Sequence, residues 1–476
     1  MLVFGCKTVE LLYCNYITNV EQFISDIPKT FDSKFKAIIL QVLYYTNEKY
    51  PNNIQFCEIL KKKLNSTKIP YFFLSDFNLL LIQSIIWGDV KINIGQNVAI
   101  VAEEKAYKFE YTKNGYKLIE IIFDEKEMPK MMNIQKVLVF ADEQQQKFMD
   151  IFKSKNPILI DKIDSKRYFE SLNEIKKWIL DKSYTKNYVI PLTPRKYFIG
   201  YEFGGTNFFL MSLDAGTVLP YERSIICPKT CLKYFIGYRK ENKLVKHKAF
   251  KVDGEAHAFK ITFAIDENNF LSLEIKKIVY EYMINFPKFC DSYKNEMTAL
   301  ENYPIIGILA NYSFICIQKN GKFEFLESWG GQWGNPMHIS FDKKKPQFGK
   351  IAEETLVKHG KYGVQNLIKI MSEGNKASTT VPQRGYTFTK DDENPILLEF
   401  ETFDGTKKSA SPEFLMAMLI RQQLKAFEKE MGKKPTKLGF CIFNDLNEKE
   451  ENNLQTALGK ACELMKIKDF CFVPRK

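Results

Sequence analysis

Residues 259–265 constrain the fold most strongly, because apolar side chains occupy every second position along this segment. A period of two is typical of a β-strand with one buried face. The polar residues 266–269 suit a turn, after which residues 270–273 can return as the second strand of a hairpin. The pattern therefore predicts an antiparallel sheet in this part of the chain.

Two apolar runs upstream, Tyr197–Phe203 and residues 208–213, predict further strands. Gly204 and Gly205 separate the two runs, and Gly216 closes the second one, as turn residues do. The glycine cluster would also suit a phosphate-binding hairpin, but an isolated glycine cluster is a weak signal.

Two segments of this region resemble parts of the peptide-binding β-domain of the seventy-kilodalton heat-shock (DnaK-type) chaperone family. "PLTPRKYFIGYEFGGTNFFLMSLDAGTVLPYERS" resembles the opening of that domain, and "HAFKITFAIDENNFLSLEI" resembles its last hairpin. The matching residues are Pro191, Leu192, Gly200, Glu202, Gly204, Gly205, Pro220, Ser224, Phe263, Asp266, Asn268 and Leu271. The resemblance implies that residues 186–276 form a β-sandwich that binds extended polypeptide, and it favours a sandwich turn at the glycine cluster.

Composition limits the partners of this 476-residue chain. Its 69 Lys and Arg exceed its 57 Asp and Glu, giving a net charge of +12, but the lysines are spread along the sequence. Because nucleic-acid binding usually requires clustered positive charge, we expect no nucleic-acid partner. Ten Cys and four His show no zinc-ligand spacing, and Cys227 and Cys231 form the only close cysteine pair. We therefore expect no metal site.

No apolar stretch predicts a membrane span, because residues 35–45 and 78–87 are too short or too interrupted. The N-terminus lacks the basic segment and uninterrupted apolar core of a signal peptide. We expect no membrane contact and a reducing, cytoplasmic location.

Residues 1–185 predict a layered α/β domain, because strand patterns alternate with helix patterns. The expected elements are a strand at 20–27, a helix at 29–45 capped by Asp32 or Ser33, a strand-turn-strand unit at 89–112, a strand at Ile134–Phe140, and helices at 143–152 and 168–180.

Residues 304–476 predict a second α/β unit. Ser411 suits a helix N-cap, Pro412 suits the first helical position, and Gly432 suits the end of that helix. A buried strand at 438–443 and a helix at 448–465 should follow. The preceding connector has helical character that Pro287 interrupts.

Both α/β regions resemble pieces of the actin-like ATPase domain of the same chaperone family. "GDVKINIGQNVAIVAEE" resembles the second phosphate-binding hairpin, and "NIQKVLVFADEQQQKFMDIF" resembles the strand and helix that close the second lobe. "PIIGILANYSFICIQKNGKFEFLES" resembles the first phosphate-binding hairpin. "SASPEFLMAMLIRQQLKAFEKEMGKKPTKLGFCIFNDLNEKEENNLQTALGKACEL" resembles the first-lobe helix, strand and following helix.

The resemblance implies an α/β plus β fold in which actin-like (ribonuclease H-like) ATPase-domain segments flank a β-sandwich. The implied parts are the later part of one nucleotide-binding domain (1–185), a substrate-binding domain (186–276), a helical connector (277–303) and the first-lobe part of a second nucleotide-binding domain (304–476). The chain would then hold parts of two tandem modules, with residues 28–40 and 443–455 as equivalent segments. Alternatively, residues 304–476 complete residues 1–185 in space.

The nucleotide-binding residues of the family are only partly present. In the first hairpin Gly307 and Ser313 match, whereas Leu309 stands in place of a carboxylate. In the second hairpin Gly95 matches and Asn93 replaces an aspartate. The resemblance implies ATP and Mg²⁺ as cofactors. Loss of one preorganised polar group typically costs ~3 kcal/mol of transition-state stabilisation, so the residues argue against ATP hydrolysis.

Two other ATPase positions also depart from the family. Residues 140–144 read Phe-Ala-Asp-Glu-Gln in place of the adenosine-contacting Gly-Gly-Ser-Thr-Arg motif. Lys369 lies near the position of the family's catalytic lysine, although it could equally be a solvated helix lysine.

The peptide-binding surface is better preserved. The matching strand lines the family's groove and here carries Phe208, Phe209, Leu210 and Met211. Because side chains alternate along a strand, we expect two of these residues in the core and two in the groove. The alternative is that all four belong to the core.

The leading hypothesis is a chaperone or pseudo-chaperone that binds unfolded or extended polypeptide, with co-chaperones as further partners, and whose ATP site is degraded. One alternative is an ATP-dependent folding chaperone with an active ATPase. Another is a non-catalytic structural or scaffold protein. The fold alone does not decide among them.

Overall fold

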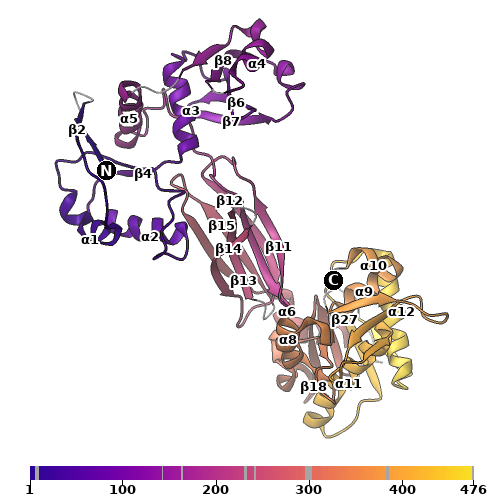
Figure 1. Cartoon of the computed structure of the whole chain (residues 1–476). Coiled ribbons are helices and arrows are strands. Elements are labelled where there is room, and N and C mark those ends of the chain that lie inside the picture. Colours follow the sequence, from indigo (N-terminus) through magenta and orange to yellow (C-terminus); the bar gives the residue numbers. More distant parts are fainter. Residues whose placement is uncertain are drawn as a thin grey trace.

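The computed structural model describes residues 1–5, 10–141, 143–161, 165–229, 233–240, 243–294, 303–381 and 385–473. Figure 1 shows three units in a row, with an all-β unit between an N-terminal and a C-terminal α/β unit. In the described part of the chain, no helix is both long enough and apolar enough to cross a lipid bilayer.

The middle unit consists of two antiparallel sheets, with strand orders β11-β10-β13-β14 and β12-β15-β16. The strands are β10 (Tyr197–Phe203), β11 (Thr206–Leu213), β12 (Tyr221–Pro228), β13 (Lys233–Lys240), β14 (Lys243–Lys251), β15 (Ala258–Ile265) and β16 (Leu271–Ile278). Both sheets contribute to one core, in which Ile199 and Ile236 of the first sheet meet Ile261 and Phe263 of the second. The period-two prediction for residues 259–265 is confirmed, because every second residue of β15 is buried.

The glycine cluster forms a hairpin turn. Phe203 pairs with Thr206, so Gly204 and Gly205 are the two turn residues between β10 and β11. Their φ angles are +56° and +78°, a region that glycine adopts without strain. The prediction of a turn within this sheet is therefore confirmed.

The N-terminal unit contains a five-stranded sheet of order β7-β6-β5-β8-β9. Its strands are β5 (Asn97–Ala102), β6 (Lys105–Thr112), β7 (Gly115–Ile122), β8 (Ile134–Phe140) and β9 (Ile158–Ile160). Helices α3 (Asp76–Trp87) and α5 (Ser165–Leu180) cover one face, and α4 (Gln145–Ile151) covers the other. A smaller layer contains α1 (Val20–Thr30), α2 (Asn53–Leu64) and the parallel pair β3 (Ile38–Leu40) and β4 (Tyr71–Phe73), while β1 (Leu2–Phe4) pairs with β2 (Leu11–Cys14).

Two predictions for the N-terminal region are wrong. Residues 20–27 belong to helix α1, whose N-cap Asn19 accepts a hydrogen bond from the Gln22 backbone N–H. The helix expected at 29–45 does not form, and β3 pairs there with β4 instead. Short apolar runs do not distinguish a strand from a helix, so the tertiary partner decides. Residues 28–40 therefore end a helix and enter a strand, and they are not equivalent to residues 443–455, which lead into a long helix.

The C-terminal unit contains a sheet of order β19-β18-β17-β27-β28, with β20 paired to β18. Its strands are β17 (Ile305–Leu309), β18 (Tyr312–Lys319), β19 (Lys322–Phe325), β20 (Asn335–Pro336), β27 (Lys437–Ile442) and β28 (Asp469–Phe472). Helices α9 (Leu367–Glu373), α11 (Pro412–Met431) and α12 (Glu448–Leu464) pack on one face, and the connector helices α6 (Glu281–Ile284) and α7 (Phe286–Lys294) pack on the other. The connector breaks at Asn285, two residues before the predicted position.

Between β20 and α11 the chain forms smaller elements. These are β21 (Ile339–Ser340), β22 (Gln347–Phe348), α8 (Gly349–Lys358), β23 (Gly363–Val364), α10 (Ala377–Thr380), β24 (Tyr386–Thr389), β25 (Leu397–Glu401) and β26 (Lys407–Ala410). The predicted caps of α11 are confirmed. The Ser411 side chain accepts from the Phe414 N–H, and Gly432 ends the helix in the left-handed region.

The two α/β units share one sheet topology. In each sheet three consecutive strands, β5-β6-β7 or β17-β18-β19, are antiparallel neighbours, and two later strands, β8 and β9 or β27 and β28, extend the sheet in parallel from the first. The turn between the first two strands and the segment after the fourth strand therefore occupy equivalent places in the two units.

Arg195 connects the middle unit to the N-terminal unit. Its buried guanidinium donates hydrogen bonds to the Leu43 carbonyl and, at 3.0 Å, to Oδ1 of Asn53. It also lies 4.8 Å from the ring centroid of Tyr238. Carbonyl, amide and aromatic groups thus compensate for the burial of this charge.

His257 connects the middle unit to the C-terminal unit. Its Nδ1 accepts a hydrogen bond from the Tyr280 backbone N–H at 2.9 Å. Its Nε2 lies 3.1 Å from the carbonyl oxygen of Gln332. Because Nδ1 accepts, the neutral ring carries its proton on Nε2 and donates it to that carbonyl.

Candidate functional site

The β17–β18 hairpin, expected to bind a phosphate, has its polar groups bonded to protein amides. The backbone N–H of Ala310 donates to Oδ1 of Asn444 at 3.1 Å. The side-chain amide of Asn311 donates to Oδ1 of Asn366 at 2.7 Å. The Asn311 carbonyl accepts from the Met337 N–H at 2.7 Å. The first two contacts occupy N–H donors that a phosphate-binding turn would present to its ligand.

Gly307 and Ser313, the two residues of this hairpin that match the chaperone pattern, are buried. An added Cβ at Gly307 would lie 2.9 Å from the ring of Phe286, so this glycine makes room for an aromatic side chain. The hydroxyl oxygen of Ser313 accepts from Trp329 Nε1 at 3.0 Å and from Gln423 Nε2 at 2.8 Å. Both residues therefore serve the core of the unit and are out of reach of a nucleotide.

The structure places the second hairpin later in the chain than predicted. Ala102 pairs with Lys105, so Glu103 and Glu104 form the turn between β5 and β6. Asn93 and Gly95 lie in an exposed turn before β5, at the opposite end of that strand. The true turn carries two carboxylates, which repel a phosphate.

Asn93 and Gly95 also have backbone partners of their own. The Asn93 N–H donates to Oε1 of Gln96 at 2.7 Å, and the Gly95 N–H donates to the Tyr111 carbonyl at 2.8 Å. At the β5–β6 turn the Gln144 side-chain amide donates to the Glu104 carboxylate, so the turn residue accepts here, whereas the Ala310 N–H donates to Asn444 in the other unit. Asp142, which belongs to the predicted adenosine-contacting stretch, lies outside the described residues.

The two expected phosphate hairpins do not come together. They lie in the α/β units at opposite ends of the middle unit in Figure 1. Lys369 is a half-exposed lysine on α9 whose Nζ lies 3.6 Å from the Glu373 carboxylate. Within the described ranges, no group of three or more His, Cys, Asp or Glu could hold a metal ion. The residues present therefore do not fit Mg²⁺-ATP bound as the family binds it.

The predicted peptide-binding residues divide between the two faces of β11. Met211 is buried in the shared core, and Phe208 packs against that core with its ring stacked on Tyr201 at 5.5 Å. Phe209 is 46% exposed and Leu210 is 41% exposed. Two of the four side chains therefore face the core and two face solvent, so the alternative of four core residues is wrong. That Phe209 and Leu210 line a peptide-binding groove stays a prediction.

A β-bulge causes this division. Ile199 pairs with Met211 but Gly200 pairs with Phe209, so Leu210 is an extra residue in β11. A bulge interrupts the strict alternation of a strand and redirects a side chain. As a result, Phe209 and Leu210 face outward together.

Strand β11 is also a free edge of its sheet. It pairs with β10 alone among the described strands, so its outer N–H and C=O groups are open for pairing. Its eight residues, TNFFLMSL, carry no charge. The opposite edge, β14, carries four lysines in nine residues, and lysines on an edge strand oppose the addition of another strand. Of the two edges, β11 is the one suited to accept a strand.

The outer face of this sheet is built from aromatic residues and glycines. Phe198 pairs with Gly237, and Gly200 pairs with Phe235. The ring of Phe235 would lie 2.9 Å from an added Cβ at Gly200, so the ring covers that glycine. Phe209 packs on both rings, with centroids 4.8 Å from Phe198 and 6.3 Å from Phe235. We refer to Phe198, Phe209 and Phe235 as the aromatic floor.

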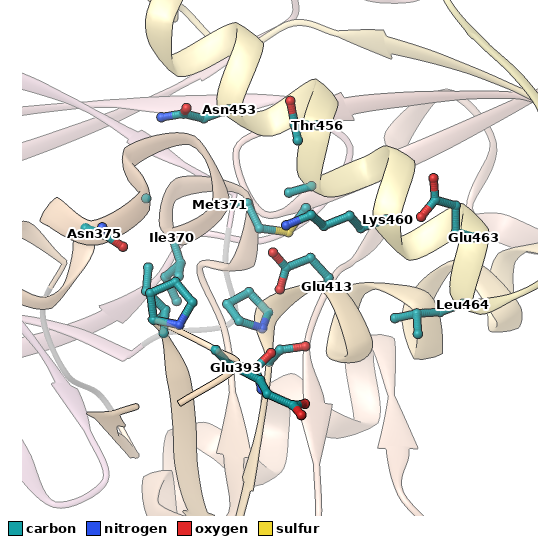
Figure 2. A pocket seen from close by; sticks show the side chains of 17 residues that line it. Ile370, Met371, Asn375, Glu393, Glu413, Asn453, Thr456, Lys460, Glu463 and Leu464 are labelled. Carbon is teal, nitrogen blue, oxygen red and sulfur yellow. The ribbon is translucent and has the colours of Figure 1, made fainter. Parts of the chain in front are cut away.

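A cavity of about 690 Å³ lies elsewhere, between α9, α11 and α12 of the C-terminal unit (Figure 2). Ile370 and Met371 contribute apolar lining, and Figure 2 shows Lys460 and Glu413 pointing into the space from α12 and α11. No sequence pattern predicts this cavity, because its lining comes from four separate segments. None of the predicted site residues lines it.

No protein-family model matches the chain.

Proposed function

We propose that this protein binds extended polypeptide along β11 and that it is a divergent relative of the seventy-kilodalton heat-shock chaperones without their nucleotide chemistry. In this proposal the α/β units are actin-like ATPase segments, and the middle unit is a peptide-binding β-sandwich. The shared strand order of the two α/β sheets supports related lobes. The shared core of the two middle sheets supports a sandwich.

The observation that carries the proposal is the free, uncharged edge of β11 next to the exposed side chains of Phe209 and Leu210. An extended peptide that adds to a sheet edge gains main-chain hydrogen bonds, and adjacent side chains provide the selectivity. The bulge at Leu210 turns two apolar side chains towards such a peptide. Strand addition at β11 therefore combines both sources of affinity.

Loss of nucleotide chemistry is supported by the amide contacts of Ala310 and Asn311 and by the two glutamates at the β5–β6 turn. These features disfavour the alternative of an active ATP-dependent chaperone. A reducing, cytoplasmic location is supported by the described cysteines, which form no disulfide bond with one another.

The proposal is tested by fluorescence anisotropy of a labelled, extended apolar peptide with the purified chain. Phe209→Asp should weaken binding by about tenfold, because a charge replaces an exposed apolar contact. Ile226→Asp is the matched control, since Ile226 is 65% exposed on β12 of the other sheet. Equal affinities of the two variants for the peptide would rule out β11 as the binding edge.

A further inference from the structure

We infer that the polypeptides bound at β11 are acidic as well as apolar, because cations surround the aromatic floor. This inference rests on the proposed function and specifies its substrate class. The side chains that carry it belong to the outer face of the sheet β11-β10-β13-β14 (Figure 1).

Three cations lie directly over the aromatic floor. Lys196 and Arg239 lie 5.7 and 5.6 Å from the ring centroid of Phe198, and Lys246 lies 4.8 Å from that of Phe235. A cation over an aromatic face is held by the ring's quadrupole. The floor therefore fixes these positive groups on the outer face, next to the exposed ring of Phe209.

Two more cations continue the same face. Lys233 pairs directly with Lys251, two residues beyond the paired Phe235 and Ala249. Because alternate residues share a face, Lys233 and Lys251 point to the same side as Phe235. Both are exposed. Lys233 stands opposite Glu202 of β10, whose carboxylate pairs with Lys246, and Lys251 forms no ion pair with a described carboxylate.

The cations of this face outnumber its carboxylates, so the face carries a net positive charge. Glu202 pairs with Lys246 at 2.8 Å, and the Lys246 side chain together with Lys233 keeps the pKa of Glu202 below its usual value. Asp214 pairs with Lys196 at 2.5 Å. The described strands β13 and β14 contain seven Lys and Arg residues and no Asp or Glu.

Protection of a sheet edge does not account for all of this charge. Lysines on β14 oppose strand addition at that edge. Lys233 and Arg239, however, lie on β13, which has a strand on each side. Positive charge on an interior strand, beside exposed apolar side chains, is complementary to a partner that carries carboxylates near apolar residues.

The partner that fits this face is an extended segment that adds to β11. Its apolar side chains would contact Phe209 and Leu210. Because neighbouring strands lie ~4.8 Å apart, β13 and β14 lie roughly 14 and 19 Å from a strand added to β11. Arg239, Lys233 and Lys251 would therefore attract the Asp or Glu side chains of the peptide across the face without pairing with them directly. Because this attraction acts through solvent, it adds selectivity and speed of association more than affinity, and salt weakens it.

The test compares two labelled peptides with the same apolar centre and either Glu or Lys flanks, titrated with the full chain. At low salt the Glu-flanked peptide should bind about tenfold more tightly, and about one molar salt should remove the difference. The double variant Lys233→Glu/Lys251→Glu should reverse the preference. The double variant Lys344→Glu/Lys408→Glu, at two exposed lysines of the C-terminal unit that form no described ion pair, is the charge-matched control and should leave the preference unchanged.

Different outcomes separate the two proposals. If both peptides bind equally and Phe209→Asp still weakens both, the acidic preference is overturned while binding at β11 stands. If neither peptide binds, both proposals fail. If a single-stranded oligonucleotide binds more tightly than the Glu-flanked peptide and displaces it, the face is a nucleic-acid surface and the acidic-peptide inference is overturned. Arg239→Glu provides a second charge reversal if the double variant does not fold.

Discussion

The side-chain oxygen of Asn444 accepts the backbone N–H of Ala310 at 3.1 Å, at the turn that the sequence resemblance predicts to bind a phosphate. A hydrogen bond within the protein must break before this N–H can bind a ligand, and an unsatisfied buried polar group is costly. In the N-terminal unit, the negative charge of Glu104 at the β5–β6 turn repels a phosphate.

The first prediction is that the chain does not bind Mg²⁺-ATP. Titration with a fluorescent ATP analogue, with and without Mg²⁺, should show no Mg²⁺-dependent binding up to millimolar nucleotide. A seventy-kilodalton heat-shock chaperone with an intact site is the positive control. Micromolar, Mg²⁺-dependent binding by the purified chain would contradict the loss of the nucleotide site.

The second prediction concerns Ser313, which accepts hydrogen bonds from Trp329 and Gln423 in the core. Ser313→Ala should lower the free energy of unfolding by about 2–3 kcal/mol, because two buried donors lose their acceptor. Urea unfolding followed by tryptophan fluorescence measures the change. Ser378→Ala, at an exposed serine of α10, is the control and should change stability by less than about 0.5 kcal/mol. Equal stabilities of the two variants would contradict the structural role of Ser313.

The third prediction concerns pH. Burial lowers the pKa of His257 from its usual value of 6.5, so the unfolded chain binds a proton more readily than the folded chain. The contribution of neutral His257 to the free energy of unfolding is therefore fully present above about pH 6.5, and it decreases as the pH falls towards the folded-state pKa. Protonation of Nδ1 also removes the acceptor of the Tyr280 N–H.

Urea unfolding at about pH 7.5 and about pH 5.5 tests this dependence. The wild-type chain should lose stability at the lower pH, and His257→Gln should lose about 1 kcal/mol less. Burial lowers the pKa of His247 and His338 in the same direction, so the variant removes only part of the effect. Identical pH dependence in wild type and variant would show that His257 is not responsible.

The fourth prediction distinguishes two neighbouring phenylalanines of β11. Phe208→Asp should destabilise the chain by about 3 kcal/mol or more, because its ring packs against the core and on Tyr201. Phe209→Asp should cost less than about 1 kcal/mol, because its side chain is nearly half exposed. Urea unfolding of the two variants measures both costs, and the reverse order would contradict the bulge in β11.

The sequence predicted elements whose signals are local. The alternation in β15 and the capping residues Ser411 and Gly432 of α11 lie within the elements that they define, and the structure confirms them. The bulge at Leu210 has no such signal, because it depends on how β11 pairs with β10. The division of Phe208 to Met211 between core and surface was expected, but the joint exposure of Phe209 and Leu210 was not.

The nucleotide residues were misplaced for a related reason. The resemblance to the chaperone family placed the second hairpin turn around Gly95, whereas the actual turn uses Glu103 and Glu104 with positive φ angles. Gly307 and Ser313 matched a family pattern, but their roles follow from Phe286, Trp329 and Gln423, which are distant in the sequence. Sequence spacing carries no information about such contacts.

The most direct test of strand addition at β11 is hydrogen exchange measured by mass spectrometry, with and without a saturating extended peptide. Outward N–H groups of a free edge exchange readily, and a bound strand protects them. The proposal predicts slower exchange across residues 206–213 and unchanged exchange across residues 243–251, which form the lysine-bearing edge. Unchanged exchange across residues 206–213 with the peptide bound would contradict the proposal.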